Sequence, residues 1–113
     1  MADKLEVLNY KDEKLNSILS VLRPVFNPTK IYLFGSRAKG LAVSGSDYDL
    51  FFVVKDSDIQ PRDRVLKARE LLWSNSVAVD LFIYTENEFN DWKDEFSSIP
   101  HTVYTEGLEL ELI

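Results

Sequence analysis

The sequence predicts an α/β (α+β) fold in which a mixed β-sheet carries helices mainly on one face. Three short apolar segments with strand-like alternation, 31–34, 47–54 and 77–84, supply the central strands. Segments with helical spacing of apolar residues lie before, between and after these strands. The chain of 113 residues is 45% hydrophobic and 28% charged, which provides for one core, and we expect a single domain, 1–113.

The first helix is expected over about residues 11–23. Its apolar residues follow helical spacing: Leu15, Ile18, Leu19, Leu22 and Val25. Pro24 and Pro28 are expected to end it, because proline does not continue a helix.

A second helix lies in the connection between the second and third strands. Pro61 is a favoured first helical residue. The expected core face consists of Val65, Leu66, Arg69, Leu72 and Trp73. The connection is long enough for a helical crossover between strands.

The last third of the chain begins with a helix-start signal. Thr85 and Glu88 have the spacing of a capping box and open a helix that is expected to run to about Phe96. Its predicted apolar stripe is Phe89, Trp92 and Phe96.

Both tryptophans, Trp73 and Trp92, stand at core-facing helical positions and are interpreted as packing anchors. His101 follows Pro100 in a predicted loop and is given no role. The tail, 108–113, alternates as an edge strand does and pairs either with the sheet or with a partner.

A glycine–serine turn and two aspartates form the most informative motif. Gly35 and Ser36 follow the first strand, and Asp47 and Asp49 begin the second. A turn of this kind presents backbone N–H groups and a hydroxyl to phosphate, and Ser36 can also cap a brief helix, 37–41. Side chains alternate along a strand, so Asp47 and Asp49 share one face.

A third carboxylate lies inside an apolar strand. Asp80 occupies the centre of 77–84, where an unpaired charge is out of place. If this strand lies beside the second one, Asp80 converges with Asp47 and Asp49. Three converging carboxylates repel each other, and hard oxygen ligands suit Mg²⁺ or Mn²⁺. The sequence therefore predicts a divalent metal site.

Each of these residues also has an ordinary structural explanation. Gly35 could serve only as a turn glycine, Ser36 as a helix cap, Asp47 as a turn residue and Asp49 as a strand-edge charge. Asp80 could belong to a salt bridge. Their joint placement favours a site instead.

Basic residues follow the same turn. Arg37 lies where it can neutralise a triphosphate, whereas the roles of Lys39 and Lys55 are left open.

These segments, GSRAKG at 35–40, SDYDL at 46–50 and VDL at 79–81, resemble the DNA polymerase beta-like nucleotidyltransferase superfamily. The similarity is greatest to its minimal nucleotidyltransferase (MNT) class and spans about residues 30–84. It implies the nucleotidyltransferase fold, ATP as substrate and two Mg²⁺ ions.

The resemblance also implies roles for the motif residues. Asp47 and Asp49 would hold the metals, and Asp80 would complete the second metal site and help to deprotonate the acceptor hydroxyl. Gly35 and Ser36 would hold the β- and γ-phosphates. In MNT proteins encoded beside a HEPN-domain partner, the family picture is an antitoxin that transfers AMP to a tyrosine of the HEPN toxin, and the same activity and partner are implied here.

The overall charge narrows the range of partners. Thirteen basic and nineteen acidic residues give a formal charge of −6, which disfavours a nucleic acid and suits a basic protein partner. The chain has no cysteine, opens with charged residues and has no apolar run longer than the five residues 50–54. We therefore expect a cytoplasmic protein that does not enter a membrane.

Other functions remain as alternatives. Transfer to a small molecule, such as an antibiotic hydroxyl, would call for an extra substrate domain. A catalytically silent module that neutralises its partner by occlusion would not call for the acid triad. Phosphoaspartate receivers and dehalogenase-type phosphatases place the apolar strand before their acids, whereas 50–54 follows Asp47 and Asp49 here.

Overall fold

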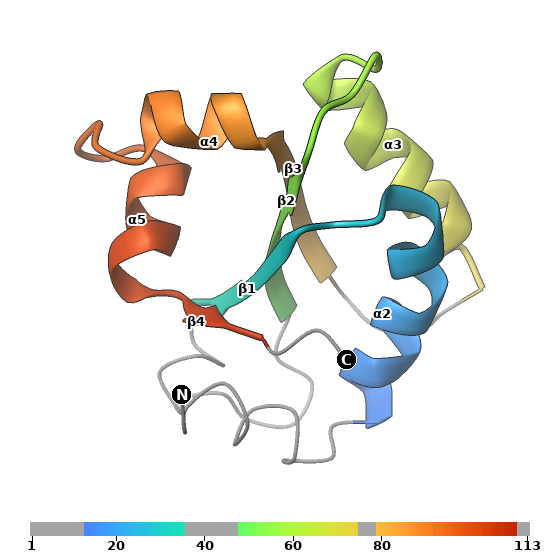
Figure 1. Cartoon of the computed structure of the whole chain (residues 1–113). Helices are drawn as coiled ribbons and strands as arrows, with labels where there is room; N and C mark the ends of the chain where they lie inside the picture. The colour runs from blue at the N-terminus through green and yellow to red at the C-terminus, as the bar shows by residue number, and fades with distance from the viewer. Residues whose placement is uncertain (1–12, 36–47, 75–78, 111–113) are drawn as a thin grey trace.

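The computed structural model describes residues 13–35, 48–74 and 79–110. It has a mixed α/β architecture, with a four-stranded sheet between helices (Figure 1). The elements, in chain order, are α2 (Glu13–Phe26), β1 (Lys30–Phe34), β2 (Tyr48–Val54), α3 (Pro61–Leu71), β3 (Val79–Thr85), α4 (Glu86–Trp92), α5 (Ile99–Glu106) and β4 (Leu108–Glu109).

The sheet has the strand order β3-β2-β1-β4 and mixes two directions of pairing. The inner strand β2 runs parallel to β3 and antiparallel to β1, which in turn pairs antiparallel with β4. The three predicted central strands are thereby confirmed within the described residues. Asp47 and residues 77–78 of those predictions lie outside the described residues, as does the predicted helix at 37–41.

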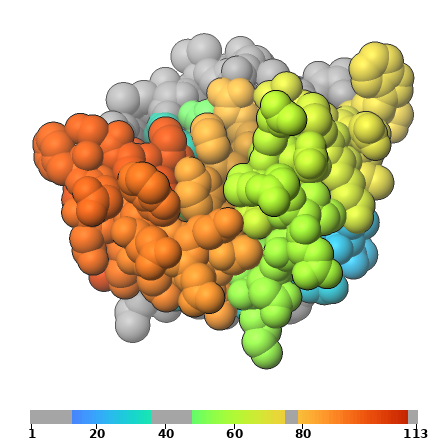
Figure 2. Space-filling model, turned by 90° about the horizontal axis from the view of Figure 1, so that it is seen from above, coloured from blue at the N-terminus to red at the C-terminus, as the bar shows by residue number. Residues whose placement is uncertain are grey.

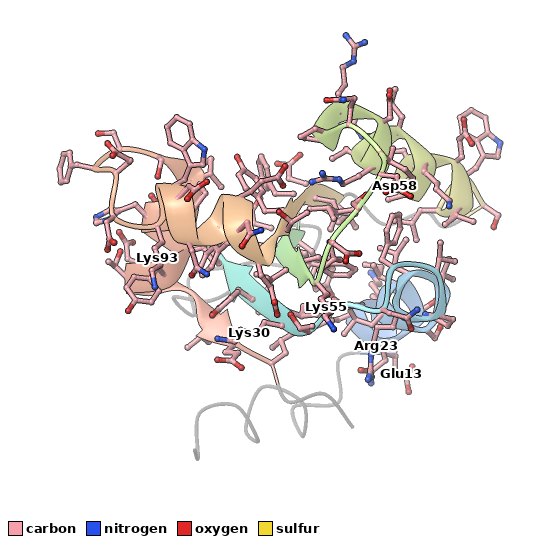
Figure 3. The ribbon with its side chains drawn as sticks, turned by 45° about the horizontal axis from the view of Figure 1, so that its top comes forward. Glu13, Arg23, Lys30, Lys55, Asp58 and Lys93 are labelled. Carbon is pink, nitrogen blue, oxygen red and sulfur yellow. The ribbon has the colours of Figure 1, made fainter. Side chains whose placement is uncertain are left out.

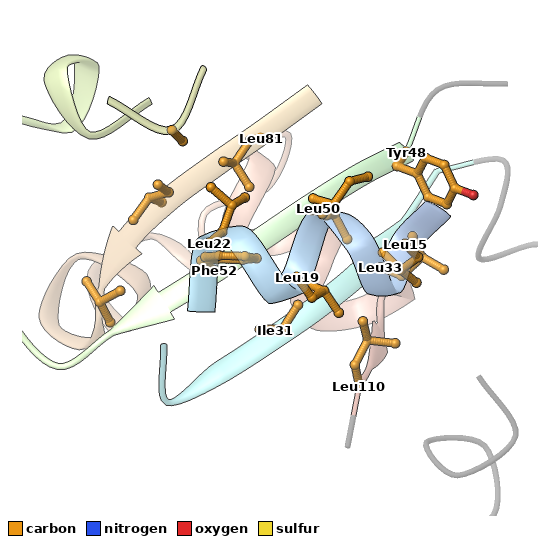
Figure 4. Close-up of a cluster of buried hydrophobic side chains, with 14 residues drawn as sticks. Leu15, Leu19, Leu22, Ile31, Leu33, Tyr48, Leu50, Phe52, Leu81 and Leu110 are labelled. Carbon is orange, nitrogen blue, oxygen red and sulfur yellow. The ribbon is translucent and has the colours of Figure 1, made fainter. Parts of the chain in front are cut away.

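One face of the sheet carries the larger core, under α2 and α3. Figure 4 shows α2 lying across the strands with its apolar side chains directed at them. Tyr48, Leu50, Phe52 and Val54 all point into this core, as alternation along the strand predicts. The helical residues buried against them are Leu15, Ile18, Leu19, Leu22 and Ala68.

The opposite face carries a smaller, aromatic core under α4 and α5. Phe51 and Val53 of β2 pack there against Phe89 of α4 and Val103 of α5. The expected fold class is confirmed, with the refinement that helices cover part of this second face as well (Figure 1). None of the described helices combines the length and apolar composition needed to cross a membrane.

The first helix runs past the proline that was expected to end it. Pro24 lies inside α2, and the helix continues to Phe26. A proline has no N–H, so it removes one hydrogen bond of the helix. Pro24 lies in the last turn of α2, where few further helical bonds follow. Asn27 ends the helix with a φ of 48° and donates its N–H to the Arg23 carbonyl at 2.8 Å. Val25, expected in the core stripe, is exposed.

The buried face of α3 is only partly the one predicted, because Leu72 packs against the core as expected but the most buried residues are others. Its buried residues are Arg64 and Ala68, whereas Leu66 is half-exposed and Trp73 is 90% exposed. The interpretation of Trp73 as a packing anchor is therefore wrong.

The reason lies in the contacts of Arg64. Its Nε donates to the Ile59 carbonyl at 2.9 Å, and its Nη1 donates to the Ile83 carbonyl at 3.1 Å and to Glu88 Oε1 at 2.7 Å. A guanidinium satisfied at all these positions can be buried. Burial of Arg64 therefore directs the side of α3 that carries Arg64 and Ala68 toward the core.

The capping box that begins α4 is confirmed. Thr85 Oγ1 accepts from the Glu88 N–H at 3.1 Å, and Glu88 Oε1 accepts from the Thr85 N–H at 2.8 Å. The helix ends at Trp92, however, and Phe96 lies beyond it in an exposed turn. Trp92 is 53% exposed, so its interpretation as a packing anchor is also wrong.

A further helix, α5, occupies the stretch that was expected to be a loop around His101. Ser98 caps it by accepting the His101 N–H at 3.1 Å, with a proline in its first turn. This serine–proline spacing is a helix-start signal that could have been recognised in the sequence. Within the described residues the tail pairs with β1 as the short edge strand β4, as predicted, while 111–113 of that prediction lie outside the described residues.

Replacement of Arg64 by alanine should lower the free energy of unfolding by about 3 kcal/mol, because the Ile83 carbonyl and Glu88 lose a buried partner. Urea denaturation measures the change. The control is Arg62→Ala on the exposed side of the same helix, which should stay within about 0.5 kcal/mol of wild type. Equal effects of the two variants would contradict this account.

The same pair predicts a dependence on pH. The Arg64 hydrogen bond, together with the Thr85 bonds, holds the pKa of Glu88 below its usual 4.5. A depressed pKa stabilises the fold fully above the unfolded value and loses that effect as the pH falls through the folded value. The difference in unfolding free energy between wild type and Arg64→Ala should therefore shrink between pH 6 and pH 3. A difference that is constant over this range would show that the ion pair is not its source.

Candidate functional site

Three strands bring the predicted acids and the glycine turn to one edge of the sheet. Phe34, the last residue of β1, pairs with Asp49 near the start of β2, and Asp49 pairs in register with Asp80 near the start of β3. Asp49 is partly buried and Asp80 is exposed. Two of the three predicted acids therefore occupy directly neighbouring positions.

Both acids lie on the same face of the sheet. Leu50 and Leu81 belong to the core under α2, so alternation directs Asp49 and Asp80 to the face that holds Phe51. Neighbouring strands lie about 4.8 Å apart, and two carboxylates at that spacing repel each other.

These two carboxylates fit a divalent cation of the magnesium type. A cation bound to both would remove their repulsion, and carboxylate oxygens are its preferred ligands. Among the described residues no group of three acids, histidines or cysteines is close enough to hold a metal. The third predicted ligand, Asp47, lies outside the described residues, as do Ser36, Arg37 and Lys39.

Gly35 lies against Asp49, and a side chain at this position would be strained. Its φ is 73°, in the left-handed region that favours glycine. A β-carbon at this position would collide with Asp49 Oδ2 and would lie 3.0 Å from Asp49 Cγ. The turn thus brings its backbone directly to the carboxylate, which places the start of the predicted phosphate turn beside the acids.

The acids border a largely buried aromatic cluster that the sequence motif did not reveal. Phe82 follows Asp80 by two residues, and its ring centroid lies 5.9 Å from that of Phe34. Phe51 follows Asp49 by two residues, is fully buried and stacks on Tyr84 at 4.9 Å. The i, i+2 spacing was visible in the sequence, but the proximity of Phe34 depends on strand register. A buried apolar cluster of this kind lowers the local dielectric constant, which strengthens electrostatic interactions nearby.

Two tyrosines of this face are poor candidates for a catalytic base. Burial raises the pKa of Tyr84, and the charge of Glu88 raises it further. Burial likewise raises the pKa of Tyr32, with a contribution from Glu109. Both phenols are therefore protonated at neutral pH and do not act as bases in that state.

Comparison with known proteins identifies the family of this chain. Residues 12–105 match the family model described as the nucleotidyltransferase domain. The chain belongs to this nucleotidyltransferase domain family, as the resemblance implied. No curated protein sequence matched it significantly.

One solved structure is similar in fold, and a second one matches with a lower score. One is described as the crystal structure of the toxin-antitoxin with AMP-PNP, with 22% sequence identity and a TM-score of 0.52 over 91% of this chain and 74% of the other. The second is a putative nucleotidyltransferase from Sulfolobus solfataricus, with 26% identity and a TM-score of 0.49 over 82% of this chain and 79% of the other.

Replacement of Gly35 by alanine should destabilise the protein in two separable ways. The left-handed backbone costs about 1–2 kcal/mol for any residue with a β-carbon. The collision with the Asp49 carboxylate should add about 1 kcal/mol or more. A double-mutant cycle with Asp49→Ala, followed by urea unfolding, should show that the second contribution disappears when the carboxylate is removed. Strictly additive effects would mean that the two residues are not in contact.

Proposed function

We propose that this protein is a Mg²⁺-dependent nucleotidyltransferase that moves AMP from ATP to a hydroxyl acceptor. The observation that carries the proposal is the pairing of Asp49 with Asp80, with Gly35 held against Asp49. The family assignment supports nucleotidyl transfer as the general chemistry.

The reaction would consist mainly of positioning and charge neutralisation. The acceptor oxygen attacks the α-phosphorus of ATP, the bond from this phosphorus to the bridging oxygen breaks, and pyrophosphate leaves. The acceptor proton passes to Asp80, which is the more exposed of the two acids. Magnesium, held by Asp47, Asp49 and Asp80, would supply charge neutralisation for the phosphates. Gly35, Ser36 and Arg37 would bind the β- and γ-phosphates.

The proposed acceptor is a tyrosine of a HEPN-domain toxin, which makes this chain an antitoxin. Support comes from the similar fold of the toxin-antitoxin structure with AMP-PNP and from the family resemblance of the motif. The formal charge of −6 also favours a basic protein over a nucleic acid as partner. The cytoplasmic location expected from the sequence belongs to the same proposal.

Replacement of Asp49 by asparagine should reduce transfer of label from α-labelled ATP to the neighbouring-gene product by about 100-fold or more. The reason is that a metal ligand worth several kcal/mol is lost while the side-chain shape is kept. Asp80→Asn should slow turnover by about 10²–10⁴-fold and change ATP binding far less, because its role lies with the acceptor proton.

The matched control is Asp58→Asn, an exposed acid in the connection leading into α3 (Figure 3). It should transfer label at the wild-type rate. Undiminished transfer in Asp49→Asn and Asp80→Asn, or no transfer by the wild type, would favour the occlusion module. Transfer to a small-molecule hydroxyl alone would identify the other alternative.

Binding of ATP should depend strongly on magnesium, because adjacent carboxylates repel a triphosphate. Calorimetric titration with and without Mg²⁺ should show weak binding in its absence. The combined variant Ser36→Ala plus Gly35→Val should bind ATP weakly even with Mg²⁺. Equal affinity in the presence and absence of the ion would rule out the proposed arrangement of acids and phosphates.

A further inference from the structure

The helices α4 and α5 expose an unusual concentration of large apolar side chains. Phe96 is 87% exposed, Trp92 and Tyr104 are each 53% exposed, and Ile99 is also exposed. We call these four residues the α4–α5 surface. They fall within 13 consecutive positions, 92–104. Single exposed apolar residues are common on protein surfaces. Exposed aromatic residues that lie together are instead typical of interaction sites.

The backbone beneath this surface is firmly held. Ser98 Oγ donates to the Trp92 carbonyl at 2.9 Å, and His101 Nδ1 donates to the Lys93 carbonyl at 2.8 Å. The Phe96 ring lies 5.8 Å from the His101 ring. These contacts hold the backbone of the turn between the helices, so little backbone freedom is lost there when a partner binds.

A non-glycine residue in the left-handed region lies in the same turn. Ser97 has a φ of 74°, a conformation that side chains with a β-carbon adopt at a cost. The Ser98 N–H donates to the Glu95 carbonyl at 3.1 Å, and the Glu95 N–H donates to the Trp92 carbonyl at 2.9 Å. The backbone bonds thus maintain a turn that leaves Phe96 in solvent.

The charge around the α4–α5 surface is predominantly negative, although Lys93 Nζ lies 4.9 Å from the centroid of the Tyr104 ring. Residues 86–106 contain six acids and a single lysine, Lys93, which Figure 3 shows on this side of the molecule. Of these acids Glu88 is paired with Arg64, while Asp91, Asp94 and Glu95 are exposed.

The second exposed tryptophan, Trp73, provides a contrast. It follows α3, where residues 61–72 contain four basic residues and two acids. Figure 2 shows the α4–α5 region (orange) beside the start of α3 (light green), whereas the end of α3 (yellow) lies on the far side of the view. A basic apolar partner is therefore attracted to α4–α5 and repelled by α3.

The position of the α4–α5 surface also relates it to the candidate site. Both helices pack on Phe51 and Val53, which project from the same face of the sheet as Asp49. A protein bound to α4 and α5 therefore lies over the side of the sheet that carries the acids.

We propose that the α4–α5 surface docks a partner protein through a basic, apolar patch of that partner. Trp92 and Phe96 insert into an apolar pocket of the partner. The basic residues around that pocket then lie against Asp91, Asp94 and Glu95. The identification of this partner with the acceptor protein rests on the proposed function. The docking itself does not require that transfer occurs.

A second copy of this chain is the other occupant to consider. Each copy carries a formal charge of −6, so copies repel each other at long range. Sedimentation of the chain alone measures this. A self-association that Trp92→Ala abolishes would overturn the proposal in favour of a homo-oligomer.

The two tryptophans allow a direct test, because they are the only ones in the chain. Trp73→Phe leaves Trp92 as the sole reporter, and Trp92→Phe leaves Trp73. Addition of the purified neighbouring-gene product should shift the emission to shorter wavelength in the Trp73→Phe protein only. A shift in the Trp92→Phe protein only, or in neither, would overturn the proposal.

Affinity measurements complete the test. Trp92→Ala and Phe96→Ala should each raise the Kd for the same protein about 30-fold or more, whereas Trp73→Ala, at a more exposed tryptophan, should leave it unchanged. Asp94→Asn plus Glu95→Gln should weaken binding and reduce its dependence on salt, unlike Asp63→Asn plus Glu70→Gln on α3.

The outcomes separate docking from chemistry. All of these variants should bind Mg²⁺ and ATP as the wild type does, because they lie away from Asp49 and Asp80. Binding that Trp92→Ala weakens, without any transfer of label, would support docking and remove the transferase proposal. Transfer that proceeds with unchanged KM for the protein acceptor in Trp92→Ala would remove the docking proposal and leave the transferase intact.

Discussion

The parallel pairing of β2 with β3 is the constraint on which the rest of the structure depends. It sets Asp49 beside Asp80 and directs both side chains to one face. Parallel strands cannot be joined by a tight turn, so the chain crosses over through α3, which packs with α2 on the other face. A single choice of strand direction thus concentrates the acids on one side and moves the crossover helix to the other.

The face of the sheet that carries Asp49 and Asp80 is divided into an aromatic part and an acidic part. Its aromatic part, around Phe51, is covered by α4 and α5, while Asp49 and Asp80 lie at the end of the sheet where β2 and β3 begin. The covering helices therefore contribute Phe89 and Val103 to the core, and Asp80 remains exposed. The separation lets one small sheet combine a packed interior with a charged site.

Local patterns in the sequence predicted the strands and the shared face of Asp49 and Asp80, because alternation is set by neighbouring residues. The buried side of α3 could not be predicted, since it depends on Arg64 reaching Glu88, 24 residues further along the chain. The contact between Gly35 and Asp49 likewise needs the register of β1 against β2, which composition does not encode. The end of α2 at Asn27 depended on a left-handed residue that competes with the more conspicuous Pro24.

Glu88 joins three elements through one carboxylate. It closes the capping box that begins α4, and it accepts a hydrogen bond from Arg64. The Arg64 guanidinium also donates to the Ile83 carbonyl near the end of β3. Loss of this carboxylate's contacts would release the start of α4 and the inner side of α3 together. The two helices, although they lie on different faces of the sheet, are thereby joined into one cooperative unit whose amide protons should exchange with solvent in concert.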